Sequence, residues 1–193
     1  MKLHLPFLIL VSMAFAGCAL FSPYTTVNDE FRNTKTSTLD ITVNPSEYQS
    51  AATNAKITFE RVTSKTNETL NAYFVIARTS SSFNLGKKCF VKADGKSYEI
   101  SIESEGSEYR TGQESTSTST IVKDSTKVKS ELVSKTNSYN WIDEKFVLRL
   151  TPEIKSSLLK TNELIFRFYF GPKEGTFRLT GYTLKRLKGL FEI

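Results

Sequence analysis

The chain has 193 residues, of which 39% are hydrophobic and 24% are charged, and its formal net charge is +6 at pH 7. This length and composition predict one globular domain with a sizeable core, and they exclude a disordered or fibrous chain. Basic and acidic residues are mixed along the chain rather than gathered into a basic stripe. We therefore expect a solvated surface and no nucleic-acid partner.

Histidine and cysteine are too scarce for many kinds of active site. The only histidine is His4, and the only cysteines are Cys18 and Cys89. Once a leader containing His4 is removed, no Ser-His-Asp or Cys-His mechanism remains, and the commonest metal ligand is missing. Two cysteines are also too few for a zinc cluster of the usual spacing. We therefore expect a non-enzymatic protein with no metal and no cofactor.

The first 17 residues have the pattern of a secretory leader. Lys2 precedes an apolar run from Leu5 to Phe15, which is too short to span a bilayer comfortably as a helix. Two cleavage chemistries fit its end. Ala14-Phe15-Ala16 obeys the small-x-small rule of ordinary signal peptidase, which would cut before Gly17. The second chemistry depends on Cys18.

The stretch Phe15-Ala16-Gly17-Cys18 resembles the lipobox of bacterial lipoproteins, with Phe15 in place of the usual Leu, as in the looser lipoboxes of spirochaetes. The resemblance implies a signal peptide at 1–17, cleavage between Gly17 and Cys18, and a diacylglycerol on the Cys18 sulfur. It thus makes a membrane the first partner, through a lipid anchor. Ala19 and Leu20 follow Cys18, with no Asp, and by resemblance to the sorting signals of enteric bacteria this favours the outer membrane over the inner.

The alternative is a secreted, soluble β protein with a Cys18–Cys89 disulfide. That bond would need an ordered segment to hold the two Cα atoms within about 7 Å of each other. Residues 18–38 are polar and irregular, which suits a tether after a lipidated cysteine. We favour the lipid anchor for this reason.

Residues 39–193 have the patterns of a single β domain. Period-two alternation predicts strands at 36–43 and 55–64, and the denser apolar run at 70–79 predicts a strand covered on both faces. Asp94-Gly95 lies between two β-type runs within 87–104 and predicts a tight hairpin turn. In the first of these runs Cys89 shares a face with Val91 and Ala93, which predicts a buried, inert thiol.

The C-terminal third predicts a strand at 139–150, a helix at 151–161, a second hairpin at 163–181 and an amphipathic helix at 182–191. The fold class predicted is mainly β: an antiparallel β-sandwich or open barrel with two short helices near the C-terminus. The order of these last elements resembles small uncharacterised envelope lipoproteins with a β-sandwich. That resemblance implies a fold and carries no assigned activity.

The segment at about 104–138 is dominated by Ser, Thr and Lys and contributes little core. It fits either a disordered loop or a long exposed hairpin, and its β-branched residues favour the hairpin. Tyr109 and Tyr139 flank it and are the candidate partner contacts, because Tyr is enriched at binding hot spots. Trp141 is interpreted instead as the start of a core strand.

Together these features predict a non-enzymatic, lipid-anchored lipoprotein of the bacterial envelope that acts as a binding or scaffolding module. Its second partner would be an unidentified protein or other envelope component. An alternative is a surface-exposed adhesin that contacts host or matrix proteins through residues 104–138.

Overall fold

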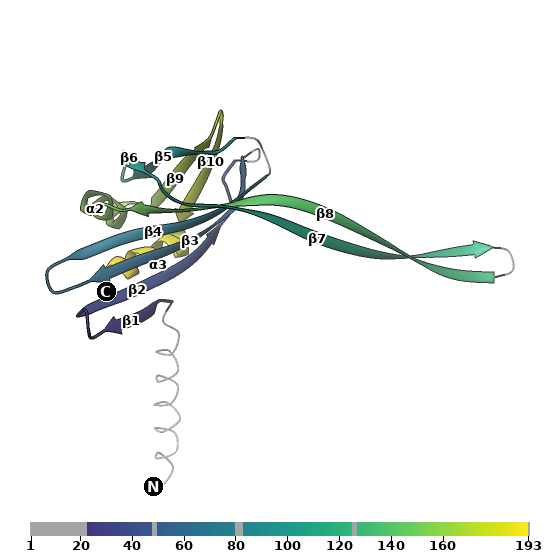
Figure 1. The fold of residues 1–193 in the computed structure, drawn as a ribbon, viewed down its shortest axis with the longest axis horizontal. Helices are drawn as coiled ribbons and strands as arrows, with labels where there is room; N and C mark the ends of the chain where they lie inside the picture. Colours follow the sequence, from purple (N-terminus) through teal and green to yellow (C-terminus); the bar gives the residue numbers. More distant parts are fainter. Residues whose placement is uncertain (1–22, 48–49, 80–82, 125–126, 193) are drawn as a thin grey trace, which may run out of the picture.

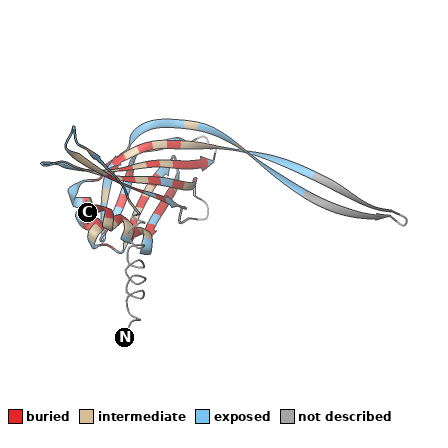
Figure 2. Cartoon of the chain, turned by 90° about the horizontal axis from the view of Figure 1, so that it is seen from below, coloured by how far each residue is buried: buried red, intermediate tan, exposed pale blue. Residues whose placement is uncertain are grey.

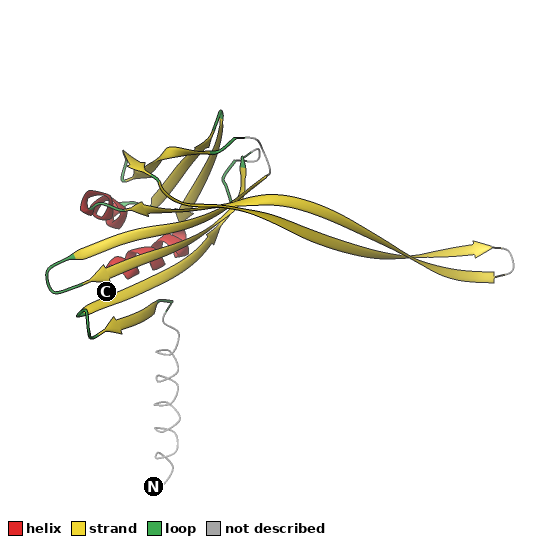
Figure 3. Ribbon diagram, in the orientation of Figure 1, coloured by secondary structure: helices red, strands yellow, loops and turns green. Residues whose placement is uncertain are grey.

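The computed structural model describes residues 23–47, 50–79, 83–124 and 127–192, and within 118–124 and 127–133 it describes the backbone alone. In the described residues, ten strands form two antiparallel sheets (Figures 1 and 3). The first sheet has the strand order β1-β2-β3-β4-β8-β7. Its strands are β1 (Thr25–Asp29), β2 (Thr34–Val43), β3 (Ala52–Thr63), β4 (Glu68–Thr79), β7 (Glu103–Asp124) and β8 (Lys127–Arg149).

The second sheet has the order β10-β9-β5-β6. Its strands are β5 (Leu85–Ala93), β6 (Lys96–Ser101), β9 (Glu163–Phe170) and β10 (Lys173–Thr180). Two helices follow β8 and β10: α2 (Pro152–Lys160) and α3 (Gly181–Glu192). The predicted fold class, mainly β and antiparallel with two short helices near the C-terminus, is therefore confirmed.

The core lies between the two sheets, where their phenylalanine side chains meet. The Phe74 ring of β4 stacks on Phe146 of β8 at a centroid distance of 5.1 Å. It also meets Phe166 and Phe168 of β9 edge-on, at 5.2 Å each. Figure 2 shows the resulting alternation of buried and exposed residues along the strands of the body. Alternation of this kind is what predicted the strands from the sequence.

The local signals at turns and helix ends are confirmed. Asp94 and Gly95 both have positive φ, at 51° and 73°, as a two-residue hairpin turn requires. Thr151 caps α2, because its side chain accepts a hydrogen bond from the Ile154 N–H, and Pro152 occupies the first turn. Helix α3 buries its apolar face, which consists of Leu184, Leu187, Leu190 and Phe191.

The first sheet begins earlier than residue 39, the boundary predicted between tether and domain. β1 starts at Thr25, and its backbone pairs with β2 from Thr25↔Thr38 to Asp29↔Thr34. Four of the five β1 side chains are exposed, so this edge strand has no apolar alternation that a sequence pattern could detect. Backbone hydrogen bonds at the sheet edge hold it instead.

Candidate functional site

The β7–β8 hairpin is the most unusual feature of the molecule, because it extends far beyond the body of the two sheets (Figure 1). Its strands pair from Glu103↔Val147 to Asp124↔Lys127. β8 is also paired with β4, but only from Asn71↔Arg149 to Thr79↔Trp141, since β4 ends at Thr79. Beyond Trp141 the hairpin is a two-stranded structure, and we call its residues 111–124 and 127–140 the ribbon.

The ribbon corresponds to most of the segment at about 104–138, for which the sequence allows either a disordered loop or a long exposed hairpin. Nearly all of its described side chains are exposed, and they are mainly Ser, Thr and other polar residues. Ser115 and Thr136 form a hydrogen bond between the strands at 3.2 Å. The ribbon therefore owes its strand conformation to cross-strand pairing and to its β-branched residues rather than to a core.

An aromatic pair lies where the ribbon leaves the sheet. The rings of Tyr139 and Trp141 stack with a centroid distance of 5.5 Å and an interplanar angle of 24°. Tyr139 pairs with Gly112 across the hairpin, and a Cβ atom on Gly112 would lie only 2.6 Å from the tyrosine ring. The absence of a side chain at residue 112 thus lets the Tyr139 ring lie across the neighbouring strand.

Charged side chains surround this aromatic pair on the same face. The Trp141 Nε1–H donates to Asp143 Oδ1 at 2.9 Å, and Arg110 Nε lies 3.4 Å from Asp143 Oδ2. Glu108 accepts hydrogen bonds from Lys145 at 2.7 Å and from Arg110 at 2.9 Å. The bond from Lys145, with the nearby Arg110 charge, holds the pKa of the Glu108 carboxyl below its ordinary value. We call these six residues the ribbon base: Glu108, Arg110, Tyr139, Trp141, Asp143 and Lys145.

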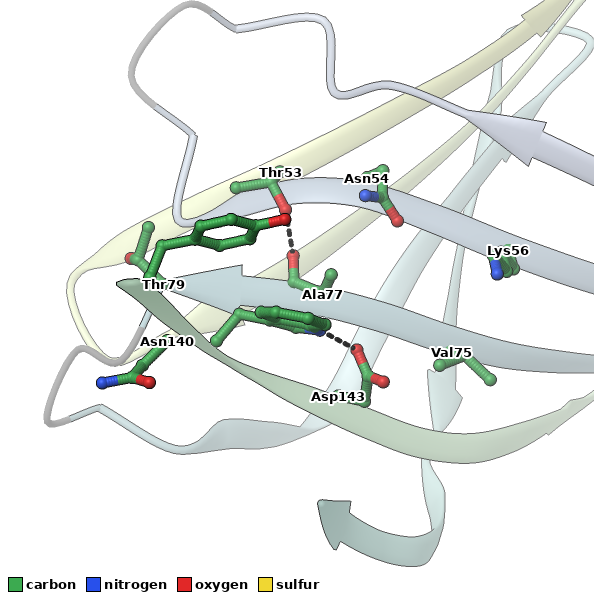
Figure 4. A pocket seen from close by; sticks show the side chains of 10 residues that line it. Thr53, Asn54, Lys56, Val75, Ala77, Thr79, Asn140 and Asp143 are labelled. Atoms are coloured by element: carbon green, nitrogen blue, oxygen red, sulfur yellow. Dashed lines mark hydrogen bonds between the residues drawn. The ribbon is translucent and has the colours of Figure 1, made fainter. Parts of the chain in front are cut away.

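The ribbon base borders a groove of about 560 Å³ on the outer face of the first sheet (Figure 4). Ala77 and Val75 of β4 form its apolar floor, and β3 and β8 form its walls. Thr53 closes one end, where its hydroxyl donates to the Ala77 carbonyl at 3.1 Å. The complete lining is Thr53, Asn54, Lys56, Val75, Ala77, Thr79, Tyr139, Asn140, Trp141 and Asp143. The groove thus combines an aromatic pair with amide, hydroxyl and charged groups, which is the mixture typical of binding sites.

The two tyrosines predicted as partner contacts are both exposed, Tyr109 by 60% and Tyr139 by 54%. They do not form one site. Tyr139 pairs with Gly112, and Tyr109 lies three residues from Gly112, so the two side chains point to opposite faces of the hairpin. The residue that Tyr139 does contact is Trp141, which lies in the groove and not in the core, contrary to its interpretation as the start of a core strand.

A buried ion pair fixes the hairpin to the body on the inner face. Arg78 of β4 and Glu144 of β8 lie 2.7 Å apart, with side chains only 4% and 6% exposed. The second carboxylate oxygen of Glu144 accepts a hydrogen bond from Ser107 of β7. Glu144 therefore joins the strand β4 of the body to both strands of the hairpin. The sequence gives no signal for this pair, because a lone Glu in a strand resembles a surface residue.

The predicted lipidation and cleavage residues, Gly17 and Cys18, lie outside the described residues. Cys89 is a free thiol in β5 with 0% exposure. Burial raises the pKa of this thiol to about 12. The prediction that Cys89 is buried is therefore confirmed.

A Ser-x-x-Lys spacing occurs at Ser157 and Lys160 of α2, although neither residue is among the predicted site residues. Ser157 is buried and shares a 2.6 Å hydrogen bond with the Tyr98 hydroxyl, whereas Lys160 is exposed. The serine thus has a packing role. Within the described part of the chain, no group of three or more His, Cys, Asp and Glu side chains is placed to hold a metal ion.

Comparison with known proteins finds no matching protein family, no similar curated protein and no similar solved structure. None of the helices in the described residues is both long enough and apolar enough to cross a bilayer. The leader and the geometry of the hairpin are therefore the features that bear on function.

Proposed function

We propose that this chain is a lipid-anchored lipoprotein of the bacterial cell envelope that binds an envelope macromolecule through its ribbon and ribbon base. The observation that carries the proposal is the ribbon itself. A two-stranded hairpin without a hydrophobic face is marginally stable in water, and its strand edges are free to pair with other chains. A long segment whose described side chains lie outside the core is typical of a functional element.

The ribbon base supplies chemistry for such a contact. Tyr139, Trp141 and Arg110 are of the three residue types most enriched at binding hot spots. They adjoin the groove, whose floor is apolar and whose rim is polar. The buried pair of Arg78 and Glu144 fastens the base of the hairpin to β4, so the ribbon base would offer a partner a preorganised surface.

The lipid anchor is supported by the leader and by the state of Cys89. The stretch Phe15-Ala16-Gly17-Cys18 resembles a lipobox. Cys89 is fully buried in β5, where a second cysteine could reach its sulfur only after local unfolding. This favours an acyl chain, rather than Cys89, as the partner of the Cys18 sulfur. Because the two acyl chains of a diacylglycerol bury many methylene groups, the attachment would be stable.

The anchor is tested by labelling cells with a palmitate analogue. We expect the wild-type protein to carry the label and to remain with the membrane fraction, and Cys18→Ser to lose both the label and membrane retention. Cys89→Ser is the matched control, which should be labelled like the wild type. An unlabelled wild type would contradict the anchor, and non-reducing mass spectrometry would then show whether a disulfide is present.

The binding role is tested by a photo-crosslinking amino acid at position 139 in intact cells. We expect crosslinked species that are missing when the same amino acid replaces Ser97, an exposed residue of β6 in the second sheet. The mass of the crosslinked partner separates an envelope component from a host or matrix protein, which would favour the adhesin alternative. The same products from both positions would sink the assignment of the ribbon base.

A further inference from the structure

The chain just after the proposed anchor is fastened to helix α3. The Tyr24 hydroxyl donates to the carbonyl of Arg186 at 2.8 Å, and the Arg186 guanidinium donates to the Pro23 carbonyl at 3.4 Å. Tyr24 also lies over Gly189, where a Cβ atom would come within 2.3 Å of its hydroxyl oxygen. Gly in a helix interior is destabilising, and here its missing side chain makes room for Tyr24.

This attachment limits how far the body can lie from a membrane. Six residue steps separate Cys18 from Tyr24, and a fully extended chain covers at most about 3.6 Å per residue, or roughly 20 Å in all. A small domain is about 30 Å across. If Cys18 is lipidated, as the proposed function has it, Tyr24 and the part of α3 beside it lie within roughly 20 Å of the bilayer surface, which is less than the diameter of a small domain.

The exposed residues of α3 suit an anionic membrane surface. Lys185 is exposed, Lys188 is half-buried, and Arg186 lies with its guanidinium carbon 5.9 Å from the centroid of the Tyr182 ring. Tyr182 is 75% exposed, and tyrosine is enriched at membrane–water interfaces. Glu192 is the only acidic residue of α3. Three basic residues and one acidic residue give this helix a positive charge that anionic headgroups would attract.

We propose that the exposed face of α3 is a membrane-docking surface for anionic phospholipid headgroups, held against the bilayer by the short connection from Cys18 to Tyr24. The inference rests on the proposed lipid anchor and adds an orientation to it. Helix α3 packs against both sheets, through β2 and β3 of the first and β9 and β10 of the second. Docking through α3 would thus fix the body, and with it the ribbon, relative to the membrane.

The test uses the purified, lipidated full-length mature protein in vesicles of phosphatidylglycerol and phosphatidylcholine. A fluorophore is attached at Tyr182→Cys or, as a control, at Ser97→Cys. Labelling is selective because Cys18 would be acylated and Cys89 is buried. Spin-labelled headgroups quench only a nearby fluorophore, so we expect quenching several-fold stronger at position 182 than at position 97. Equal quenching at the two positions would overturn the docking surface.

Two comparisons test whether anionic headgroups cause the quenching at position 182. The double variant Lys185→Glu and Lys188→Glu, with the same probe at 182, should lose most of the excess quenching at 182 over 97. The protein with both lysines intact and the probe at 182 should lose it likewise in vesicles of phosphatidylcholine alone. Quenching at 182 that persists in both would overturn the role of anionic headgroups. The palmitate label reports separately on the anchor, so a labelled protein with no quenching at 182 would contradict only this inference. Trp141 emission checks that each variant is folded, since the chain has one tryptophan.

Discussion

Replacing Glu144 by Ala is expected to lower the free energy of unfolding by about 3–5 kcal/mol, the usual cost of removing one partner of a buried ion pair. The substitution leaves the Arg78 guanidinium, whose side chain is 4% exposed, without this carboxylate. It also removes the acceptor of the Ser107 hydroxyl on β7. Urea denaturation of the wild type and the variant measures the loss.

Two further variants test whether the expected loss of stability comes from the burial of this ion pair. Glu99→Ala breaks the pair with Lys88, whose side chains are 61% and 48% exposed, and should change stability by less than about 1 kcal/mol. The double variant Arg78→Met and Glu144→Leu removes both charges and should recover most of the loss, because an apolar pair of similar volume replaces the ion pair. Similar losses for Glu144→Ala and Glu99→Ala would show that the burial of this pair is of no consequence.

The strands of the body could be predicted from the sequence because their two faces differ. In β2, Leu39 and Ile41 are buried while Asp40 between them is exposed, so the pattern carries the structure. β1 and the ribbon have polar residues on both faces, and no alternation marks where they begin or end. Their pairing depends on backbone hydrogen bonds, which every residue type except proline can both donate and accept.

The ribbon base could be predicted only in part. Of the two tyrosines that flank the polar segment, Tyr139 lines the groove. Tyr109 and Tyr139 lie on opposite faces of the hairpin, which the sequence does not predict, because facing relationships across a hairpin depend on the register and the sequence of a polar hairpin does not fix it. Arg110 and Asp143 join the aromatic pair only through that register. The hydrogen bond from Tyr24 to α3 joins residues that are far apart in the sequence, so no local pattern predicts it.

Truncation of Phe74 should be among the most costly changes in the core, because its ring contacts three others from both sheets. It stacks on Phe146 within the first sheet and meets Phe166 and Phe168 of the second edge-on. Phe74→Ala should lower the free energy of unfolding by about 3–5 kcal/mol, through lost burial and the cavity left behind. Phe74→Leu, which fills part of that cavity, should lose less.

Phe31 provides the matched control, because it is 100% exposed in the connection between β1 and β2. Phe31→Ala should change the stability by no more than about 0.5 kcal/mol, as is usual for surface substitutions. Urea denaturation of the three variants alongside the wild type gives the order Phe74→Ala, Phe74→Leu, Phe31→Ala from the largest loss to the smallest. A Phe74→Ala variant as stable as Phe31→Ala would mean that the two sheets do not pack through these rings. These rings would then add little to the apolar burial between the sheets, although such burial is the dominant favourable term in folding.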